Sequence, residues 1–197
     1  MKKTIAASTI AFALAFGLGA QDTEKTQGQH RIIIGLHTSL GFPQEKDVWD
    51  NVGAGRGYCL FAEVEIAPHV ALRGAGEYTK FHGVDWGYGL KTSAKSLEFR
   101  CDLVFRGESI IKGGFFFAGL GSVNLTSEAK LNKFTVSEDA GGLSLSFGVG
   151  WDFFGGGCGI EMRYAKASGI KFESAFQAES YSCVQLNARM RFPAIGH

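Results

Sequence analysis

The chain is poor in several features that would point to a function. After the N-terminal region, no stretch approaches the roughly 18 consecutive apolar residues of a membrane-spanning helix, so no such helix is predicted. The 20 Lys and Arg residues nearly balance the 19 Asp and Glu residues, which gives no electrostatic reason to expect nucleic acid as a partner. The four cysteines show no CxxC or Cys/His spacing, so no metal site is predicted. The glycine-rich segment 53–57 leads into a predicted strand and not into a helix, so no cofactor is expected.

The N-terminus has the pattern of an export signal. Lys2 and Lys3 precede the apolar run TIAASTIAFALAFGLGA, which predicts a signal peptide over 1–20, with cleavage near 19–21, and one domain over 21–197. Its removal would leave 18 Lys and Arg against 19 Asp and Glu, a net charge of −1. A membrane anchor is the weaker interpretation, because the run is short for a bilayer span.

Proline is scarce, at 3 residues, whereas glycine reaches 28 and phenylalanine 17. Abundant glycine and aromatic residues with regularly spaced turns favour an all-β chain. Eight segments alternate between apolar and polar residues with the period of two that strands produce. These segments are 30–38, 58–66, 70–81, 96–105, 110–123, 142–153, 158–166 and 184–192. The fifth is apolar on both faces near its middle, so its inward face is left open.

The alternation gives each predicted strand one apolar and one polar face. A soluble barrel would bury the apolar face, whereas a barrel in lipid would turn that face outward and enclose the polar one. The second arrangement predicts a polar network in the lumen, formed by Glu63, Glu65, Arg73, Glu77, Glu98, Arg100, Asp102, Asp152, Glu161, Arg163, Arg189 and Arg191.

Three features favour the barrel in lipid. The predicted connections alternate between tight ones (67–69, 106–109, 154–157) and long ones (39–57, 82–95, 124–141, 167–180), as in outer-membrane barrels. Most segments have the roughly 9–11 residues that cross the hydrocarbon layer at a tilt. Aromatic residues gather near the strand ends, as interfacial girdles would. The predicted girdles are Phe105, Trp151, Phe153 and Phe192 at the short-turn end, and Tyr58, Tyr78 and Tyr164 toward the long loops.

The second and third segments also allow a register prediction. If 67–69 is a three-residue turn, Ile66 faces Val70. Glu63 then lies opposite Arg73, as an inward ion pair, and Tyr58 lies opposite Tyr78. Because an unpaired charge in the lumen would be costly, such a pairing is physically required.

These residues resemble the small eight-stranded outer-membrane barrels of the OmpA/OmpX type. The resemblance rests on the signal peptide and on the strands APHVALRGAGEYTKF, GLSLSFGVGWDF and VQLNARMRF, and it spans nearly all of the mature chain. It implies an eight-stranded antiparallel up-and-down transmembrane β-barrel, with periplasmic termini and four long external loops. It also implies that Phe192, which closes the last alternating strand, is the signal read by the barrel-assembly machinery. The chain departs from the family pattern by adding PAIGH after this residue.

The sequence offers little catalytic chemistry. Cys59 and Cys183 share inward parity on the two strands that flank the first one. Their sulfurs are therefore expected about two strand spacings apart, beyond the reach of a disulfide, so four free cysteines are favoured over a Cys59–Cys183 bridge. The only adjacent His, Thr and Ser residues are His37 to Ser39, and neighbours in a strand point to opposite faces. No catalytic residue is therefore predicted, and the chain is expected not to be an enzyme.

The predicted function is that of an integral protein in the outer membrane of a diderm bacterium, with a structural or surface-interaction role. Its expected partners are outer-membrane lipid and lipopolysaccharide, and the barrel-assembly machinery during biogenesis; no nucleic acid is expected, and the partner of the external loops is unknown. Trp49, Trp86 and Tyr88 in those loops are candidates for contact or for rim packing. The alternatives are a narrow conduit for small or apolar solutes, motivated by Phe61 and the run 115–117, a lipid-modifying enzyme, and a secreted lipocalin-like barrel.

Overall fold

The computed structural model describes residues 32–44, 52–85, 87–107, 112–170 and 180–193. The predicted signal peptide, Trp49, Trp86 and residues 194–197 of the terminal PAIGH lie outside these residues. Among the described residues, none belongs to a helix with the length and apolar character that crossing a membrane requires.

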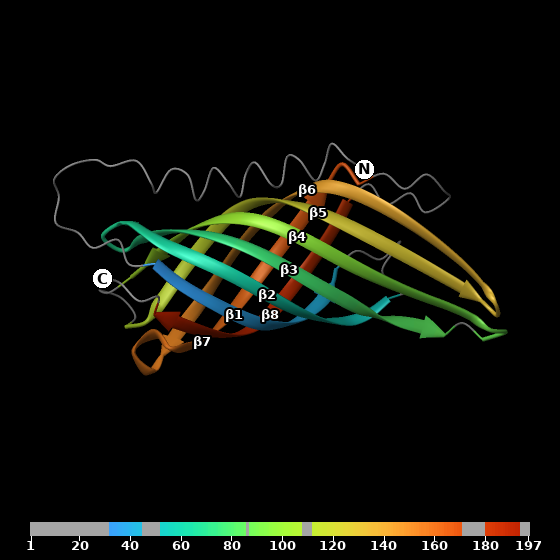
Figure 1. The fold of residues 1–197 in the computed structure, drawn as a ribbon, viewed down its shortest axis with the longest axis horizontal. Coiled ribbons are helices and arrows are strands. Elements are labelled where there is room, and N and C mark those ends of the chain that lie inside the picture. Colours follow the sequence, from blue (N-terminus) through green and yellow to red (C-terminus); the bar gives the residue numbers. More distant parts are fainter. Residues whose placement is uncertain (1–31, 45–51, 86, 108–111, 171–179, 194–197) are drawn as a thin grey trace.

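Eight antiparallel strands form one closed barrel in which each strand pairs with its neighbour in sequence and β8 closes onto β1 (Figure 1). The strands are β1 Ile32–Pro43, β2 Val52–Ala67, β3 Val70–Asp85, β4 Leu90–Arg106, β5 Gly114–Leu131, β6 Phe134–Phe153, β7 Cys158–Ser168 and β8 Ser180–Pro193. A short 3-10 helix, η2 Phe154–Gly156, links β6 to β7. Because the sheet closes on itself, no strand is left at an edge along the shared length of the barrel.

The two ends of the barrel differ. The connection between β2 and β3 is short, and Ile33 of β1 pairs with Pro193 of β8, so the first strand begins and the last strand ends at this short-turn end. At the opposite end, β3 to β6 extend well past the other strands (Figure 1). Only two residues, Asn132 and Lys133, join β5 to β6 there.

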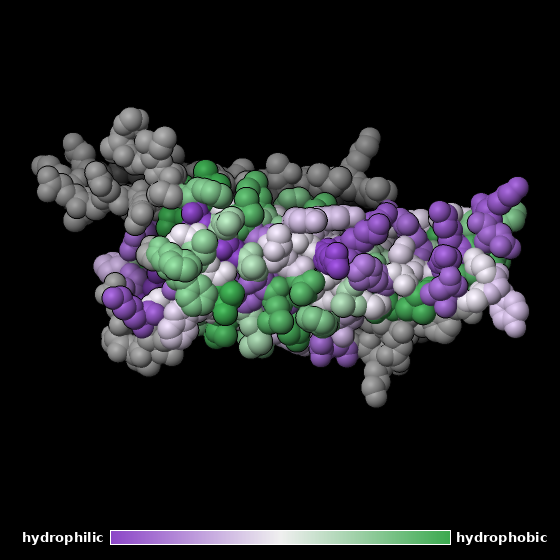
Figure 2. Space-filling view, turned by 90° about the horizontal axis from the view of Figure 1, so that it is seen from below, coloured by the Kyte–Doolittle hydropathy of each residue, from purple (hydrophilic) through white to green (hydrophobic). Residues whose placement is uncertain are grey.

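The alternation of side chains places apolar residues outside the barrel and polar ones inside. Leu60 and Leu120 on the outer face are each 66% exposed, whereas Arg73 and Arg163 in the lumen are 1% and 0% exposed. Figure 2 shows hydrophobic side chains gathered over the part of the displayed face nearer the short turns, and hydrophilic ones at the end formed by the long hairpins. The outer surface therefore has an apolar belt, and the charges that a soluble protein would expose lie in the interior.

The all-β class, the eight strands and their up-and-down order agree with the sequence prediction, but the strands are longer than predicted. The segments 82–95 and 124–141, predicted as long loops, are largely strand: β3 and β4 reach Asp85 and Leu90, and β5 and β6 leave only a two-residue turn. The glycine-rich segment 53–57 also lies in β2. These parts of the hairpins lie beyond the apolar belt, so both of their faces can be polar and hydrophobic periodicity does not reveal them.

The predicted register of β2 and β3 is confirmed in its main part. Glu63 pairs with Arg73 and Tyr58 pairs with Tyr78. Ile66 does not pair with Val70, because a bulge between Glu65 and Ala67 brings Ala67 opposite Val70. The turn is one residue tighter than predicted, and His69 takes up the tighter turn at a φ of 65°.

The structure also assigns the inward face of β5, which the sequence left open. Phe115 and Phe117 point inward and are 5% and 1% exposed, whereas Phe116 points outward and is 55% exposed. Phe116 stacks on Phe105 of β4, with ring centroids 4.8 Å apart.

Candidate functional site

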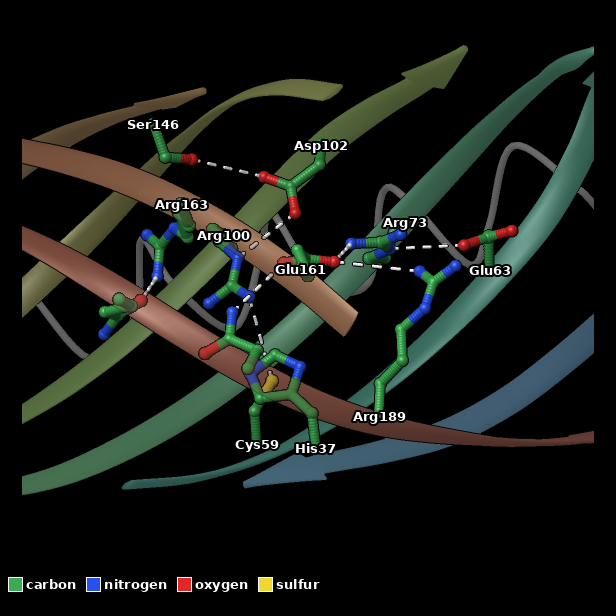
Figure 3. A network of polar contacts seen from close by, with 12 residues as sticks. His37, Cys59, Glu63, Arg73, Arg100, Asp102, Ser146, Glu161, Arg163 and Arg189 are labelled. Carbon is green, nitrogen blue, oxygen red and sulfur yellow. Dashed lines mark hydrogen bonds and ion pairs between the residues drawn. The ribbon is translucent and has the colours of Figure 1, made fainter. Parts of the chain in front are cut away.

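The most unusual feature of the barrel is a network of ion pairs that fills its lumen (Figure 3). Six carboxylates and six arginines take part among the described residues: Glu63, Glu77, Glu98, Asp102, Asp152 and Glu161 with Arg73, Arg100, Arg106, Arg163, Arg189 and Arg191. Because the two signs are equal in number, the interior of this part of the barrel carries no net charge. The ion pairs divide into two clusters along the barrel axis.

The first cluster lies near the short-turn end and is centred on Glu63. Its carboxylate accepts hydrogen bonds from Arg73 Nε at 3.2 Å and from Arg191 Nη2 at 3.0 Å, and it also pairs with Arg106. Asp152 pairs with Arg191 at 3.0 Å and with Arg189. Glu161 completes this cluster, and its carboxylate contacts Arg73 at 2.9 Å. With three carboxylates and four arginines, this short-turn cluster has one excess positive charge.

The second cluster lies further along the axis and is centred on Glu77. Its Oε2 accepts hydrogen bonds from Arg100 at 2.7 Å and from Arg163 at 3.1 Å, and its Oε1 accepts one from Gln185 at 2.9 Å. Asp102 pairs with Arg100 at 3.1 Å and Glu98 with Arg163. This central cluster has three carboxylates and two arginines, so it has one excess negative charge.

Aromatic rings pack against two of the arginines of the short-turn cluster. The guanidinium of Arg73 lies over the rings of Phe61 and Phe117, at 5.2 and 5.3 Å from their centroids, and that of Arg189 lies 3.9 Å from the centroid of Phe115. Cation–π attraction is stronger where water is excluded. The inward phenylalanines that motivated the conduit alternative therefore pack against lumen charges.

The lumen toward the long hairpins is closed by apolar side chains. This apolar plug consists of Phe81, Ala94, Val123, Leu125, Ala140, Ala167, Ile170, Tyr181 and Cys183. Phe81 and Tyr181 meet edge to face, with centroids 6.2 Å apart. An eight-stranded barrel leaves an interior that side chains alone can fill, and here the ion pairs and the plug occupy it.

The predicted lumen residues can now be placed. Nine are buried: Glu63, Arg73, Glu77, Glu98, Arg100, Asp102, Glu161, Arg163 and Arg189. Asp152 and Arg191 are half-buried, whereas Glu65 is exposed at the short-turn rim, where the bulge interrupts the alternation.

Sequence reasoning missed several polar members of the lumen. They are His37, Ser39, Arg106, Ser144, Ser146, Gln185 and Asn187, all of which share the inward parity of their strands. Ser39 donates a hydrogen bond to Glu77 at 3.0 Å and Ser144 one to Glu98 at 2.7 Å. The two-residue period alone places these residues inside, although most of them carry no permanent charge and Arg106 lies just beyond the predicted end of its strand.

The predicted girdle residues all lie on the outer face. Tyr58 and Tyr78 are cross-strand partners toward the long hairpins, and Tyr164 packs against Phe147 with centroids 5.2 Å apart. Trp151, Phe153 and Phe192 are 36%, 40% and 52% exposed near the short-turn end, and Phe105 lies at the same end of β4. The aromatic side chains thus border the apolar belt on both sides.

A row of cations lies immediately beyond the tyrosines. Arg56 pairs with Lys80 in the β2–β3 register, and Lys80 pairs with Lys95 in the β3–β4 register. Each is two residues beyond Tyr58, Tyr78 or Leu97 on its own strand and shares its outward parity. Lys95 forms an ion pair with Glu128, whereas Arg56 and Lys80 have no ion-pair partner among the described residues. Like charges opposite one another destabilise a sheet, so this outer basic row favours an external anion.

The structure assigns no catalytic arrangement to the residues considered above. His37 and Ser39 point inward and are buried, whereas Thr38 between them points outward. All four cysteines are free, so the disulfide between Cys59 and Cys183 is absent. Cys101 and Cys158 lie half-buried on the outer side.

An inward network of paired charges, an outward apolar belt and aromatic borders together define the class of protein: a small outer-membrane-type β-barrel. Solved structures with this fold include the attachment invasion locus protein Ail of Yersinia pestis, at a TM-score of 0.57 and 17% identity over 85% of this chain and 100% of that one. Neisserial surface protein A has a TM-score of 0.54 and 14% identity over 83% of this chain and 97% of its own. A major outer membrane protein of Thermus thermophilus has a TM-score of 0.55 and 12% identity over 83% and 100%.

The chain therefore has the OmpA/OmpX type of eight-stranded barrel fold. No family model matches the sequence, and no curated protein sequence matches it. The similarity is thus one of architecture.

Proposed function

We propose that this protein is an integral barrel of the bacterial outer membrane, with a structural or surface-interaction role and no enzymatic activity. The observation that carries the proposal is the inside-out distribution of side chains, with leucines two-thirds exposed outside and arginines fully buried within. Burying apolar area is the main driving force of folding in water, so such an outer surface is stable only against acyl chains. The similar folds of bacterial outer-membrane proteins support the same location.

Membrane fractionation combined with a gel-mobility assay tests this proposal. We expect the chain in the outer-membrane fraction, and we expect the folded barrel to resist cold detergent and to change mobility after boiling, because all strands unfold together. A mature chain that is monomeric and folded in buffer without any surfactant would contradict the proposal, and would favour the secreted lipocalin-like alternative.

The filled lumen argues for a structural role over solute passage. Arg73, Arg163 and Arg189 project across it with exposures of 1%, 0% and 2%, and the apolar plug closes its far end. We therefore expect flat current traces when the protein is reconstituted in planar bilayers. Reproducible single-channel steps from the wild-type barrel, absent in mock preparations, would instead support the conduit.

We further propose that the outer basic row binds phosphate-bearing head groups of the outer leaflet, lipopolysaccharide among them. Cations just beyond an aromatic girdle lie at the depth of such phosphates. During biogenesis, the barrel-assembly machinery would recognise the last strand, with Phe192 as its closing aromatic residue. The partner of the external hairpins is not proposed, although Tyr88, which is fully exposed, is available for contact.

Changing Arg56, Lys80 and Lys95 together to glutamine tests the basic row. Each cation near an anionic surface strengthens binding, so the triple variant should bind lipid A phosphates roughly a hundredfold more weakly. The affinity of the detergent-solubilised protein is measured for lipid A and, separately, for vesicles of phosphatidylglycerol. Comparing the two affinities distinguishes the phosphates of lipopolysaccharide from those of phospholipid. The matched control changes Lys91, Lys130 and Lys133 of the distal hairpins to glutamine. Equal losses in both variants would contradict a specific role for the row.

A further inference from the structure

A cluster of three possible metal ligands lies in the central part of the lumen. His37 of β1, Cys59 of β2 and Glu77 of β3 each offer one ligand atom, and these atoms lie within 4.8 Å of one another. The three residues are successive cross-strand partners: His37 pairs with Cys59, and Cys59 pairs with Glu77. Figure 3 shows the ring of His37 next to the sulfur of Cys59. Because the ligands come from three strands, no local sequence motif marks them.

His37 is the observation that points to a ligand. Its side chain is 1% exposed, and neither ring nitrogen has a hydrogen-bond partner among the described residues. Its Nε2 lies 3.6 Å from Glu77 Oε2, too far for a hydrogen bond. A buried imidazole without a hydrogen-bond partner destabilises the folded state, and metal coordination would remove that cost.

The geometry fits a tetrahedral ion. Zinc bonds of about 2.0–2.3 Å to nitrogen, oxygen and sulfur set the ligand atoms roughly 3.3–3.7 Å apart. The separation of His37 and Glu77 is already in this range at 3.6 Å. The widest separation in the cluster, at most 4.8 Å, needs a contraction of about 1 Å, which side-chain rotation supplies.

The charge of the surroundings also fits a cation. The central cluster has three carboxylates and two arginines, so it has one excess negative charge. When a divalent ion binds, a bond from sulfur to the metal forms, the S–H bond breaks and the proton passes to the buffer. The net gain is one positive charge, which cancels the excess. The guanidinium groups of Arg100 and Arg163 that also contact Glu77 are thereby balanced by Glu98 and Asp102.

We propose that His37, Cys59 and Glu77 form a luminal site for a divalent transition-metal ion of the zinc type. One thiolate, one imidazole and one carboxylate are ligands that zinc accepts together, whereas calcium and magnesium prefer oxygen alone. The ion would join three consecutive strands inside the barrel. Because the apolar plug and the ion pairs close the lumen, it would enter while the barrel folds.

Refolding the denatured chain into detergent micelles with Zn²⁺, or with Co²⁺ as a spectroscopic probe, tests this site. After gel filtration, the wild-type protein should hold about one metal ion per chain, and the cobalt form should show a thiolate-to-metal charge-transfer band. Cys59→Ser and His37→Gln should each lower the affinity at least tenfold. The matched control is Cys183→Ser, which changes another buried, inward cysteine outside the cluster.

The heat-modifiable gel shift is measured on every variant, so that loss of metal is compared among folded barrels only. Wild-type protein that folds without retaining metal would overturn the inference, and so would Cys59→Ser protein that binds as tightly as wild type. Either result would leave the membrane location of the barrel untouched, because the gel shift and the fractionation report on it separately.

Discussion

Replacing Glu77 with alanine should destabilise the barrel by about 3–5 kcal/mol, the cost of removing one member from a network of buried ion pairs. Both Arg100 and Arg163 donate to its Oε2, and both are fully buried. In the variant these guanidinium groups would keep only Asp102 and Glu98 as carboxylate partners. The change is measured as a lower urea midpoint for unfolding from detergent micelles, with the heat-modifiable gel band as the measure of folded protein.

Two comparison variants make the Glu77 result interpretable. Asp85→Ala removes an ion pair with Lys91 in which both side chains are more than half exposed, so its urea midpoint should stay close to that of wild type. Glu77→Gln retains an acceptor for Ser39 and Gln185 but loses the charge, so its midpoint should fall between those of wild type and Glu77→Ala. A Glu77→Ala barrel that unfolds at the same urea concentration as Asp85→Ala would show that the central cluster does not depend on this carboxylate.

Introducing arginine at Leu120 should destabilise the folded barrel by about 2–4 kcal/mol in lipid vesicles. Leu120 lies on the outer face of β5, pairs with Cys101 and Leu145, and is 66% exposed. A charge at such a position enters hydrocarbon if the belt contacts acyl chains, but it enters water if the barrel is soluble. The measurement is the urea dependence of folding into vesicles, followed by gel mobility.

Val136→Arg is the matched control for the belt. Val136 is 64% exposed, nearly the same fraction as Leu120, but it lies on the part of β6 that extends beyond the belt. Surface substitutions outside special environments change stability by about 0.5 kcal/mol or less. Two variants of equal stability would mean that the apolar belt does not contact lipid, and the proposed location would be wrong.

The strand segments within the apolar belt could be predicted because their outer face is apolar and their inner face carries polar and charged side chains. That contrast fixes the parity of most strands, and a tight turn then fixes Glu63 opposite Arg73. The fifth strand resisted prediction because Phe115 and Phe116 are equally apolar in sequence. Phe115 points inward, where Arg189 lies over its ring, and that contact depends on closure of the barrel.

Closure also explains why the central cluster could not be derived from the sequence. The parity of Glu77 was evident, but its partners Arg163 and Gln185 lie 86 and 108 positions away in the chain. Which inward side chains meet across a barrel depends on how far the strands are staggered around the ring. Hydrophobic alternation carries no information about that stagger, so the contacts of Glu77 with Arg163 and Gln185 become visible only in three dimensions.

In the proposed orientation, the hairpins that continue past the belt determine what a partner outside the cell would encounter. β5 and β6 remain paired as far as Leu131 and Phe134, so this projection is a hydrogen-bonded sheet. A flexible loop loses conformational freedom when a partner binds it, which costs about 1–2 kcal/mol for each residue that becomes fixed. A sheet that is already ordered is spared most of that loss, and even a small, shape-matched contact with it could therefore be tight.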